Sequence, residues 1–193
     1  MMNLLRPALL LLVLLTVITG GVYPLLTTVI GDELFPQKVQ GSLIVQQGNV
    51  RGSQLIGQDF SHPGYFQGRP SATADHANNP MASGGSNLSV TNPQLIQRVD
   101  QQITLLRSQN PEANTQVPTE LITTSASGLE PMLSVAAVQW QIPRVARARQ
   151  LSVSEVEQLV QQFTTKPLLS FMGPAVVNVV SLNLALDQYS QGK

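Results

Sequence analysis

The feature that most constrains this chain is an uncharged apolar stretch near its N-terminus. From Pro7 to Gly31 no residue carries a charge, and leucine, valine and isoleucine predominate. A helix over this stretch would be about 36 Å long, at about 1.5 Å per residue. Because the hydrocarbon core of a bilayer is about 30 Å thick, the stretch predicts a transmembrane helix over residues 7–30. Residues 1–6 then form a short N-terminus, and residues 31–193 form a single domain.

A cleaved secretory signal peptide is the alternative interpretation of the same stretch. Arg6 would be its basic region and residues 8–18 its apolar core. Two features favour a retained helix instead: no A-x-A-like small-residue site follows the apolar core, and the apolar character continues to Ile30. We therefore expect the mature protein to keep Met1 or Met2.

The charges that flank the stretch predict its orientation. Arg6 and the terminal amine precede it, whereas Asp32 and Glu33 follow it. Since the positive end of a membrane helix stays in the cytoplasm, residues 1–6 are expected there and residues 31–193 on the extracytosolic side.

The same stretch carries a patch of small residues. Thr16 and Gly20 are four residues apart, hence on one helix face, and Gly21 adjoins them. Small residues let a second helix approach closely, which drives helix association in lipid. Pro24 lacks an amide donor and is expected to kink the segment. We interpret the patch as a helix-packing site, although glycine and proline are also generally common in membrane helices.

Composition excludes several classes of protein. The formal net charge is zero and only 11% of residues are charged, which argues against a nucleic-acid-binding surface. There is no cysteine, so a disulfide scaffold and a thiolate metal site are excluded. About 160 residues follow the apolar stretch, enough for one domain with its own core.

The pattern along residues 32–193 predicts an α+β domain that is mostly helical. Residues 32–90 are irregular, with short strand candidates at 42–45, 50 and 55–56. A helix should begin at Pro93 after the cap Asn92, with one apolar stripe formed by Leu95, Ile96, Val99, Ile103 and Leu106.

Further helices are expected toward the C-terminus. One should start after the cap Ser134 and break or kink at Pro143, and another after the capping box formed by Ser152 and Glu155. Residues 176–186 fit both an alternating strand and a helix, and Pro174 near their start favours the helix.

One loop is a candidate for binding phosphate. Ser83, Gly84, Gly85 and Ser86 could cradle a nucleotide through successive backbone amides. The loop lacks the lysine of the G-x-x-x-x-G-K-[ST] motif, so a structural glycine loop is the preferred interpretation. No other nucleotide or cofactor site is indicated.

Arg69 and Ser71 are candidates for contact with a partner. Arg69 is a lone charge among small residues and could hold an anion or a partner's carboxylate; the alternative is that it bonds loop carbonyls of its own domain. Arg144, Arg147 and Arg149 would form a basic patch on a solvated face.

The sequence offers no catalytic group. His62 and His76 lack a carboxylate cluster of ligand spacing, so no metal site is expected. A G-x-S-x-G nucleophile elbow is absent. Ser125 and Ser127 are best interpreted as turn residues whose hydroxyls bond their own backbone.

Taken together, short strings along the chain resemble the C subunit of the bacterial Kdp potassium-transporting P-type ATPase. Each string alone is weak, but their order and spacing are specific. The strings are residues 6–8, 19–28, 51–53, 55–58, 65–66, 68–74, 82–88, 125–129, 144–146 and 182–187.

The resemblance implies a single-pass subunit of the bacterial inner membrane whose domain lies in the periplasm. Its implied partners are a channel-like potassium-translocating subunit, a P-type ATP-hydrolysing subunit and a small single-span subunit. The family is described as a catalytic chaperone that raises the ATP affinity of the hydrolysing subunit, with a glutamine proposed to contact ATP. The chain would not be an enzyme by itself.

The flanking charges favour an indirect effect on ATP affinity. ATP is cytoplasmic, whereas residues 31–193 are expected outside. The expected role is therefore assembly and stabilisation of the complex, with any effect on ATP transmitted as a coupling free energy. The alternative is a stand-alone, membrane-tethered periplasmic hydrolase or binding protein.

Overall fold

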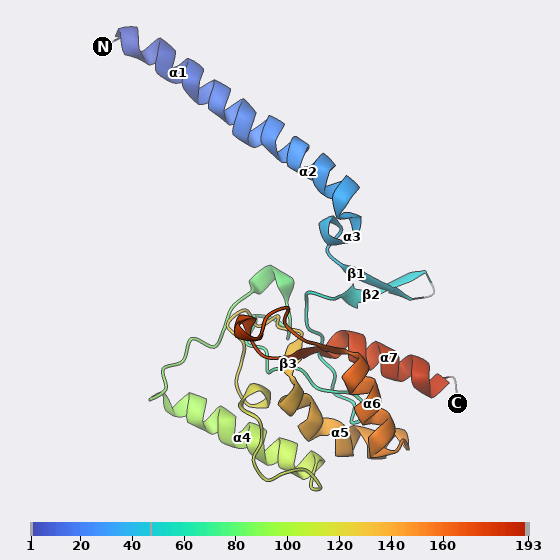
Figure 1. Cartoon of the computed structure of the whole chain (residues 1–193). Helices are drawn as coiled ribbons and strands as arrows, with labels where there is room; N and C mark the ends of the chain where they lie inside the picture. Colours follow the sequence, from blue (N-terminus) through green and yellow to red (C-terminus); the bar gives the residue numbers. More distant parts are fainter. Residues whose placement is uncertain (1, 47, 192–193) are drawn as a thin grey trace. The chain divides into compact units, whose positions relative to one another are not determined.

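The apolar N-terminal stretch forms a helix, as its composition predicts (Figure 1). A computed structural model describes residues 2–46 and 48–191; Met1 and Lys193, and with them the expected first residue and the C-terminal end of the domain, lie outside the described residues. The chain divides by its contacts into two units, Met1–Leu43 and Ile44–Lys193. We call them the helical unit and the folded unit.

The helical unit consists of α1 (Met2–Val17), a π-helical turn η1 (Ile18–Val22), α2 (Tyr23–Leu34) and the short α3 (Pro36–Val39). The apolar segment Leu4–Leu34 has a mean hydropathy of 2.4 over its most apolar window, and none of that window is buried. It is the one helix in the described part of the chain that is long and apolar enough to cross a membrane.

Pro24 does not end this helix, and the irregularity falls in the turn before it. The amide of Tyr23 donates to the carbonyl of Ile18, five residues back, so the turn is wider than an α-helical one. Thr19 Oγ1 donates to the carbonyl of Leu15 at 2.7 Å. Such a turn is a common way for a helix to accommodate a nearby proline.

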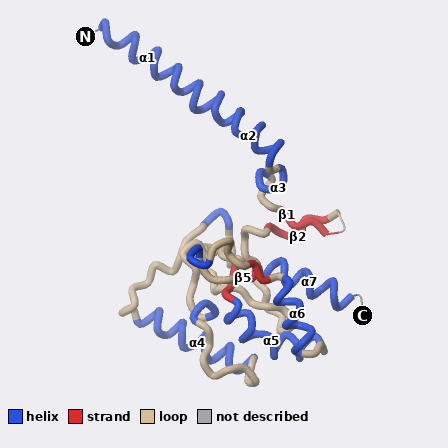
Figure 2. The backbone as a smooth tube through the Cα atoms, viewed as in Figure 1, coloured by secondary structure: helices blue, strands red, loops and turns tan. Residues whose placement is uncertain are grey.

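The described residues of the folded unit form two small sheets and four longer helices (Figure 2). Strands β1 (Leu43–Gln46) and β2 (Asn49–Ser53) pair with each other. The second sheet has the order β3-β5-β4, and both pairs are antiparallel. Its strands are β3 (Met132–Ser134), β4 (Thr164–Thr165) and β5 (Val176–Asn178). The longer helices are α4 (Pro93–Gln109), α5 (Val135–Arg149), α6 (Val153–Gln162) and α7 (Val179–Gln191).

Short 3₁₀ turns are also present: η2 (Pro80–Ala82), η3 (Thr119–Leu121) and η4 (Ser170–Met172). Mixed helix and sheet, with the strands short and few, confirms the predicted α+β class.

The predicted helix starts are confirmed by their capping bonds. Asn92 Oδ1 accepts from the amide of Gln94 at 2.9 Å, and Ser134 Oγ accepts from the amide of Ala137 at 3.3 Å. Ser152 and Glu155 form the complete capping box of α6. Satisfying these otherwise unpaired amides is what fixes where each helix begins.

Other sequence-based predictions were wrong in whole or in part. Residues 55–56 form no strand, and of the break or kink expected at Pro143 the break does not occur, because α5 continues to Arg149. The carbonyl that Pro143 leaves without a helical partner belongs to Gln139, which is exposed, so water can satisfy it. Residues 176–186 divide into a strand and a helix, because β5 completes the sheet before α7 begins at Val179.

The core forms around α5. Its buried members include Val138, Ile142 and Val145 of α5, and they cluster with side chains from α6, β5 and α7. Val177, the central residue of β5, is fully buried and pairs with Leu133 on one side and Thr164 on the other. Burial of this cluster is the main source of stability of the folded unit.

Candidate functional site

The predicted helix-packing residues lie in and beside the π-helical turn. Thr16 is in α1, and Gly20 and Gly21 are within η1. Thr16 and Gly20 are exposed, and a Cβ atom added at either glycine would have no atom within 4 Å. Within the helical unit this face is therefore open, and it offers the flat, small-residue surface on which membrane helices pack closely.

The predicted loop candidates come together in the folded unit. Three loops, residues 68–74, 82–88 and 125–129, bond to one another, and we call them the loop platform. The amide of Gly84 donates to the carbonyl of Ser127 at 2.9 Å, and Ser83 Oγ donates to the same carbonyl at 3.0 Å. Ser71 Oγ donates to the carbonyl of Gly128 at 2.8 Å.

Ser71 is a hub within the platform. Besides its bond to Gly128, its Oγ accepts from the amide of Asn78 at 3.0 Å and lies 2.9 Å from Thr73 Oγ1. Gly128 has a φ of +70°, and a Cβ there would lie 2.6 Å from Thr73 Cγ2 and 2.7 Å from the carbonyl of Gly84. This position therefore requires glycine.

The glycine loop is packed into this platform. A Cβ at Gly85 would lie 3.1 Å from the carbonyl of Ala126, so Gly85 permits a close backbone contact. The amide of Gly84 is already used by Ser127, whereas a phosphate cradle needs successive free amides. The geometry fits a structural loop, with Gly85 and Ser86 at its border to a cleft.

Arg69 bonds within its own unit. Its Nη2 donates to the carbonyl of Thr124 at 3.0 Å, and its Nε reaches the carbonyl of Thr123 at 3.4 Å. The guanidinium thus ties residues 68–74 to residues 123–124, the arrangement considered above as the alternative to a partner contact.

A cleft of about 670 Å³ lies between the loop platform and α4. Arg98 lines it as an exposed cation from α4, accompanied by Gln101, Gln102 and Leu105. The opposite wall includes Ser71, Thr73, Ser86 and Thr123. The cleft is open and its lining is mixed, with apolar side chains, hydroxyls and carboxamides but no carboxylate among its lining residues.

Sequence reasoning missed how the segment 63–67 is held. This segment lies in no sheet, so its backbone has no neighbouring strand to bond with. Two buried side-chain carboxamides provide these hydrogen bonds instead. Asn183 accepts from the amide of Phe66 and donates to its carbonyl, both at 2.8 Å. Gln141 accepts from the amide of Gln67 at 2.8 Å and donates to its carbonyl at 3.0 Å. Each carboxamide satisfies the backbone of one residue as a neighbouring strand would.

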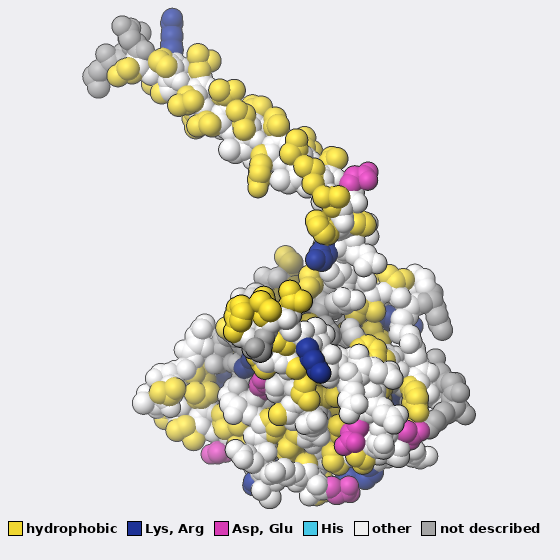
Figure 3. Space-filling view, in the orientation of Figure 1, with side chains coloured by type: hydrophobic (Ala, Val, Ile, Leu, Met, Phe, Trp, Pro, Cys, Tyr) yellow, Lys and Arg dark blue, Asp and Glu magenta, His cyan; other side chains and the backbone are white. Residues whose placement is uncertain are grey.

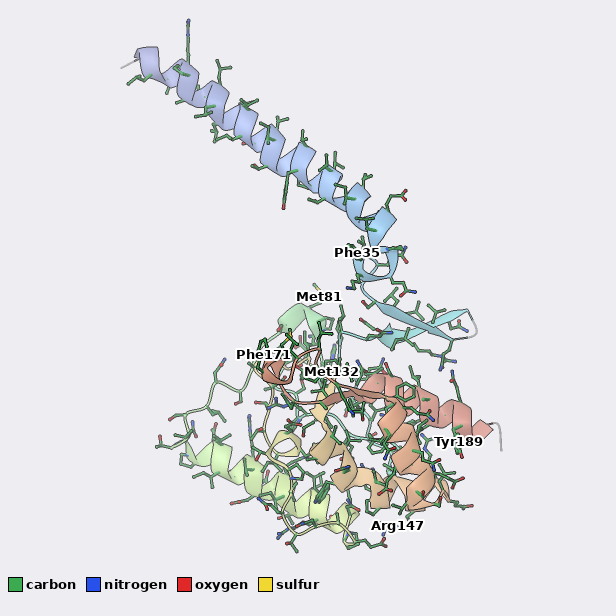
Figure 4. The ribbon with its side chains drawn as sticks, viewed as in Figure 1. Phe35, Met81, Met132, Arg147, Phe171 and Tyr189 are labelled. Carbon is green, nitrogen blue, oxygen red and sulfur yellow. The ribbon has the colours of Figure 1, made fainter. Side chains whose placement is uncertain are left out.

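The predicted basic patch does not exist. Arg144 is buried, and donates to the carbonyls of Pro63 and Tyr65 at 2.5 and 3.0 Å and to Gln141 at 2.8 Å. Burial, with a smaller effect of the nearby Arg147, lowers the pKa of Arg144 to about 10. Arg147 points outward to Glu112, 2.8 Å away (Figure 4), while Arg149 pairs with Asp187 at 2.8 Å. One sequence signal could have revealed these buried contacts: Arg144 and Asn183 are polar residues within helical stripes that are otherwise apolar.

Within residues 2–46 and 48–191 no group of three or more His, Cys, Asp or Glu side chains could hold a metal ion. His62 Nδ1 accepts from the amide of Gly64 at 3.1 Å, and His76 Nδ1 lies 3.0 Å from the carbonyl of Ala77. Both histidines thus have local backbone partners.

A candidate single-span helix joined to an α+β unit with its own core defines the class: a membrane-anchored domain protein. Comparison with known proteins gives the family. Residues 5–188 match the family model described as KdpC: K+-transporting ATPase, c chain. The chain belongs to this family.

Similar proteins match it along almost its whole length. A potassium-transporting ATPase KdpC subunit of Klebsiella pneumoniae (strain 342) is 60% identical over 186 residues, covering 96% of this chain and 97% of the relative. The subunit of the same name from Enterobacter sp. (strain 638) is 55% identical with the same coverage. That of Escherichia coli O139:H28 is 54% identical over 187 residues, 97% of this chain and 98% of the relative.

Proposed function

We propose that this chain is a non-catalytic, single-span subunit of a potassium-transporting ATPase, and that it assembles and stabilises the complex. The observation that carries this proposal is the contrast between its two units. The folded unit buries its own core, whereas the segment Leu4–Leu34 has 31 residues and its apolar window is wholly unburied. A helix of this kind needs lipid or other membrane helices around it. The relatives are named as subunits of a potassium-transporting ATPase, and such a complex would provide other membrane helices for contact.

The face formed by Thr16, Gly20 and Gly21 packs on the helices of the potassium-translocating subunit. Its support is the open space at both glycines and the small size of the three side chains themselves. The remaining partners are the ATP-hydrolysing subunit and a small single-span subunit. The N-terminus lies in the cytoplasm and the folded unit in the periplasm, as the charges of Arg6, Asp32 and Glu33 favour.

Any rise in the ATP affinity of the hydrolysing subunit is transmitted through the complex as a coupling free energy. ATP is on the cytoplasmic side, and the Ser83–Ser86 loop uses the amide of Gly84 internally. A direct nucleotide contact by this loop would need that bond to break.

Substitution in the packing face tests the assembly role. Gly20→Leu adds bulk to the face, and Ala8→Leu adds similar bulk elsewhere in the same helix. We expect Gly20→Leu to reduce co-purification with the other subunits at least tenfold while membrane insertion is unchanged, and Ala8→Leu to leave both unchanged. Normal yield of the complex with Gly20→Leu would refute the packing face.

Sidedness and nucleotide contact have separate tests. Because the chain has no cysteine, Gln158→Cys in α6 provides a single label on the folded unit. A membrane-impermeant maleimide should label it from the periplasmic side of intact inner membranes, and labelling only in inverted vesicles would reverse the orientation. Low-micromolar binding of labelled ATP to the full chain alone would favour direct contact.

A further inference from the structure

The loop between β4 and β5 exposes a group of large apolar side chains. Leu168 is 90% exposed, Phe171 83% and Met172 63%, and Leu169 is about half exposed. We call residues 166–174 the apolar loop. Figure 3 shows apolar atoms gathered on this part of the folded unit, and Figure 4 places Phe171 on it. Side chains this exposed contribute little to the core of their own unit, and a group of them close together is typical of an interaction site.

Both ends of the apolar loop are anchored in paired strands. Its two ends enter β4 and β5, which pair antiparallel with Thr165 opposite Val176. The next residue of β5, Val177, is fully buried in the core. Within the loop, the amide of Met172 donates to the carbonyl of Leu169 at 3.0 Å and closes the turn η4. The apolar tip is therefore carried by the core sheet.

Charge around the loop suits a lipid surface. Lys166 precedes the apolar residues and is exposed. The sequence contains no Asp or Glu between Glu157 and Asp187. A loop with aliphatic and aromatic residues, one flanking lysine and no carboxylate can enter the headgroup region without burying a negative charge, and its lysine can reach anionic headgroups.

The connection between the two units is short. Nine residues, 35–43, separate Leu34 at the end of α2 from Ile44. Fully extended they span about 30 Å, so the start of the folded unit at Ile44 stays within that distance of the end of α2. Such a tether keeps the folded unit, and with it the apolar loop, at a high effective concentration near the membrane surface.

We propose that the apolar loop inserts Leu168, Phe171 and Met172 into the interfacial layer of the bilayer that the chain's own helix crosses. The exposure of these side chains and the flanking Lys166 favour lipid over a protein partner, because the interfacial layer can take up exposed apolar tips without a preformed pocket and offers anionic headgroups to the lysine. The inference rests on the proposed function only in requiring a retained membrane helix. Insertion would give the folded unit a second attachment and limit its rotation about residues 35–43.

Lipid-depth quenching tests this proposal in the full chain. Leu168→Cys places a fluorophore on the loop and leaves Phe171 and Met172 in place, and Gln158→Cys in α6 is the matched exposed control. Both are reconstituted alone in phosphatidylethanolamine/phosphatidylglycerol vesicles, with or without lipids carrying a nitroxide near the headgroup. We expect at least threefold stronger quenching at position 168 than at 158, and a return to the control level when Phe171→Ser and Met172→Ser are added.

Equal quenching at the two positions would overturn the proposal. A further measurement uses vesicles that contain the assembled complex. If the label at position 168 is then shielded from both nitroxide lipid and aqueous iodide, the loop lies against protein and the proposal is also overturned. Because the first experiment uses the chain alone and assembly is scored by co-purification, failure of insertion is distinguishable from failure of the proposed function.

Discussion

Helices α4 and α5 look alike in sequence and differ in what they bury. Each begins at a side-chain cap and carries apolar residues at helical spacing. In α5 eight of fifteen residues are buried, whereas in α4, all seventeen residues of which are described, only Leu106 is. Ile96, a member of the predicted apolar stripe of α4, is 54% exposed. The predicted stripe therefore forms a helix but not a core face.

The difference lies in the neighbours of each helix. Helix α5 follows β3 directly and packs on α6 and on the central sheet. Helix α4 is attached near its C-terminal end, where Asn110 Nδ2 donates to the carbonyl of Trp140 at 2.6 Å and Arg107 donates to the carbonyl of Thr115. Between Leu95 and Leu105 it borders the open cleft. An amphipathic pattern thus predicts a helix, while burial depends on which tertiary partner is available.

Paired isoleucine substitutions should separate the two helices most strongly. Ile142→Ala in α5 removes a side chain that is 2% exposed and should lower the free energy of unfolding by about 3 kcal/mol, within the range for buried large-to-small changes. Ile96→Ala in α4 should cost about 0.5 kcal/mol or less. Urea unfolding of the full chain in detergent, followed by the fluorescence of its single tryptophan, measures both. Equal losses would contradict the comparison.

Paired glutamine substitutions should have the next largest effect on the free energy of unfolding. Gln141→Leu in α5 leaves the amide and carbonyl of Gln67 without partners and takes an acceptor from Arg144, so a loss of about 2–3 kcal/mol is expected. Gln101→Leu in α4 changes an exposed side chain and should alter stability by about 0.5 kcal/mol or less. The same unfolding assay applies, and a small effect of Gln141→Leu would show that water replaces its bonds.

Removing the helix cap should affect global unfolding in α5 and local opening in α4. Ser134→Ala and Asn92→Ala each remove one capping bond, worth about 1 kcal/mol. For α5 the loss should appear in global unfolding, because that helix is central to the core. For α4 it should appear as faster amide exchange in residues 93–98, with a smaller change in global stability. Global losses of the same size for both would show that α4 unfolds only with the core.

The smallest expected effect is a pH dependence of Arg144. Burial lowers its pKa to about 10, so above this pH the folded chain releases a proton that the unfolded chain still binds. The cost of burying this charge is complete below about pH 10 and declines above it. Relative to Arg144→Met, the wild type should gain about 1 kcal/mol between pH 9 and 11. Urea unfolding at pH 9 and pH 11 measures this gain, and an unchanged difference between the two proteins would contradict it.

Local signals were predictable from the sequence, and contacts distant in the chain were not. The apolar helix and the caps Asn92, Ser134 and Ser152 depend on neighbouring residues, and each was located correctly. Strand β3 has three residues and exists only because β5 pairs with it from more than 40 positions away. In such short strands the partner, rather than intrinsic propensity, decides the structure.

The same holds for the candidate site. The strings around Arg69, Gly85 and Gly128 were recognised individually, but their convergence into one platform depends on bonds such as Ser71 Oγ to the carbonyl of Gly128. Arg144 was expected on the surface because its two neighbouring arginines suggested a charged face. Burial instead follows from the carbonyls of Pro63 and Tyr65, which lie about 80 positions earlier.

The hydrogen bonds between Asn183 and the backbone of Phe66 have a consequence for the deamidation of this protein. Hydrolysis of an asparagine side chain to a carboxylate preserves its shape but removes the donor that the Phe66 carbonyl requires, and it would leave a negative charge at a fully buried position. Yet the reaction proceeds through a cyclic imide that needs a backbone freer than that of α7. The bond that would be lost to chemical damage is therefore protected for as long as the helix containing it stays folded.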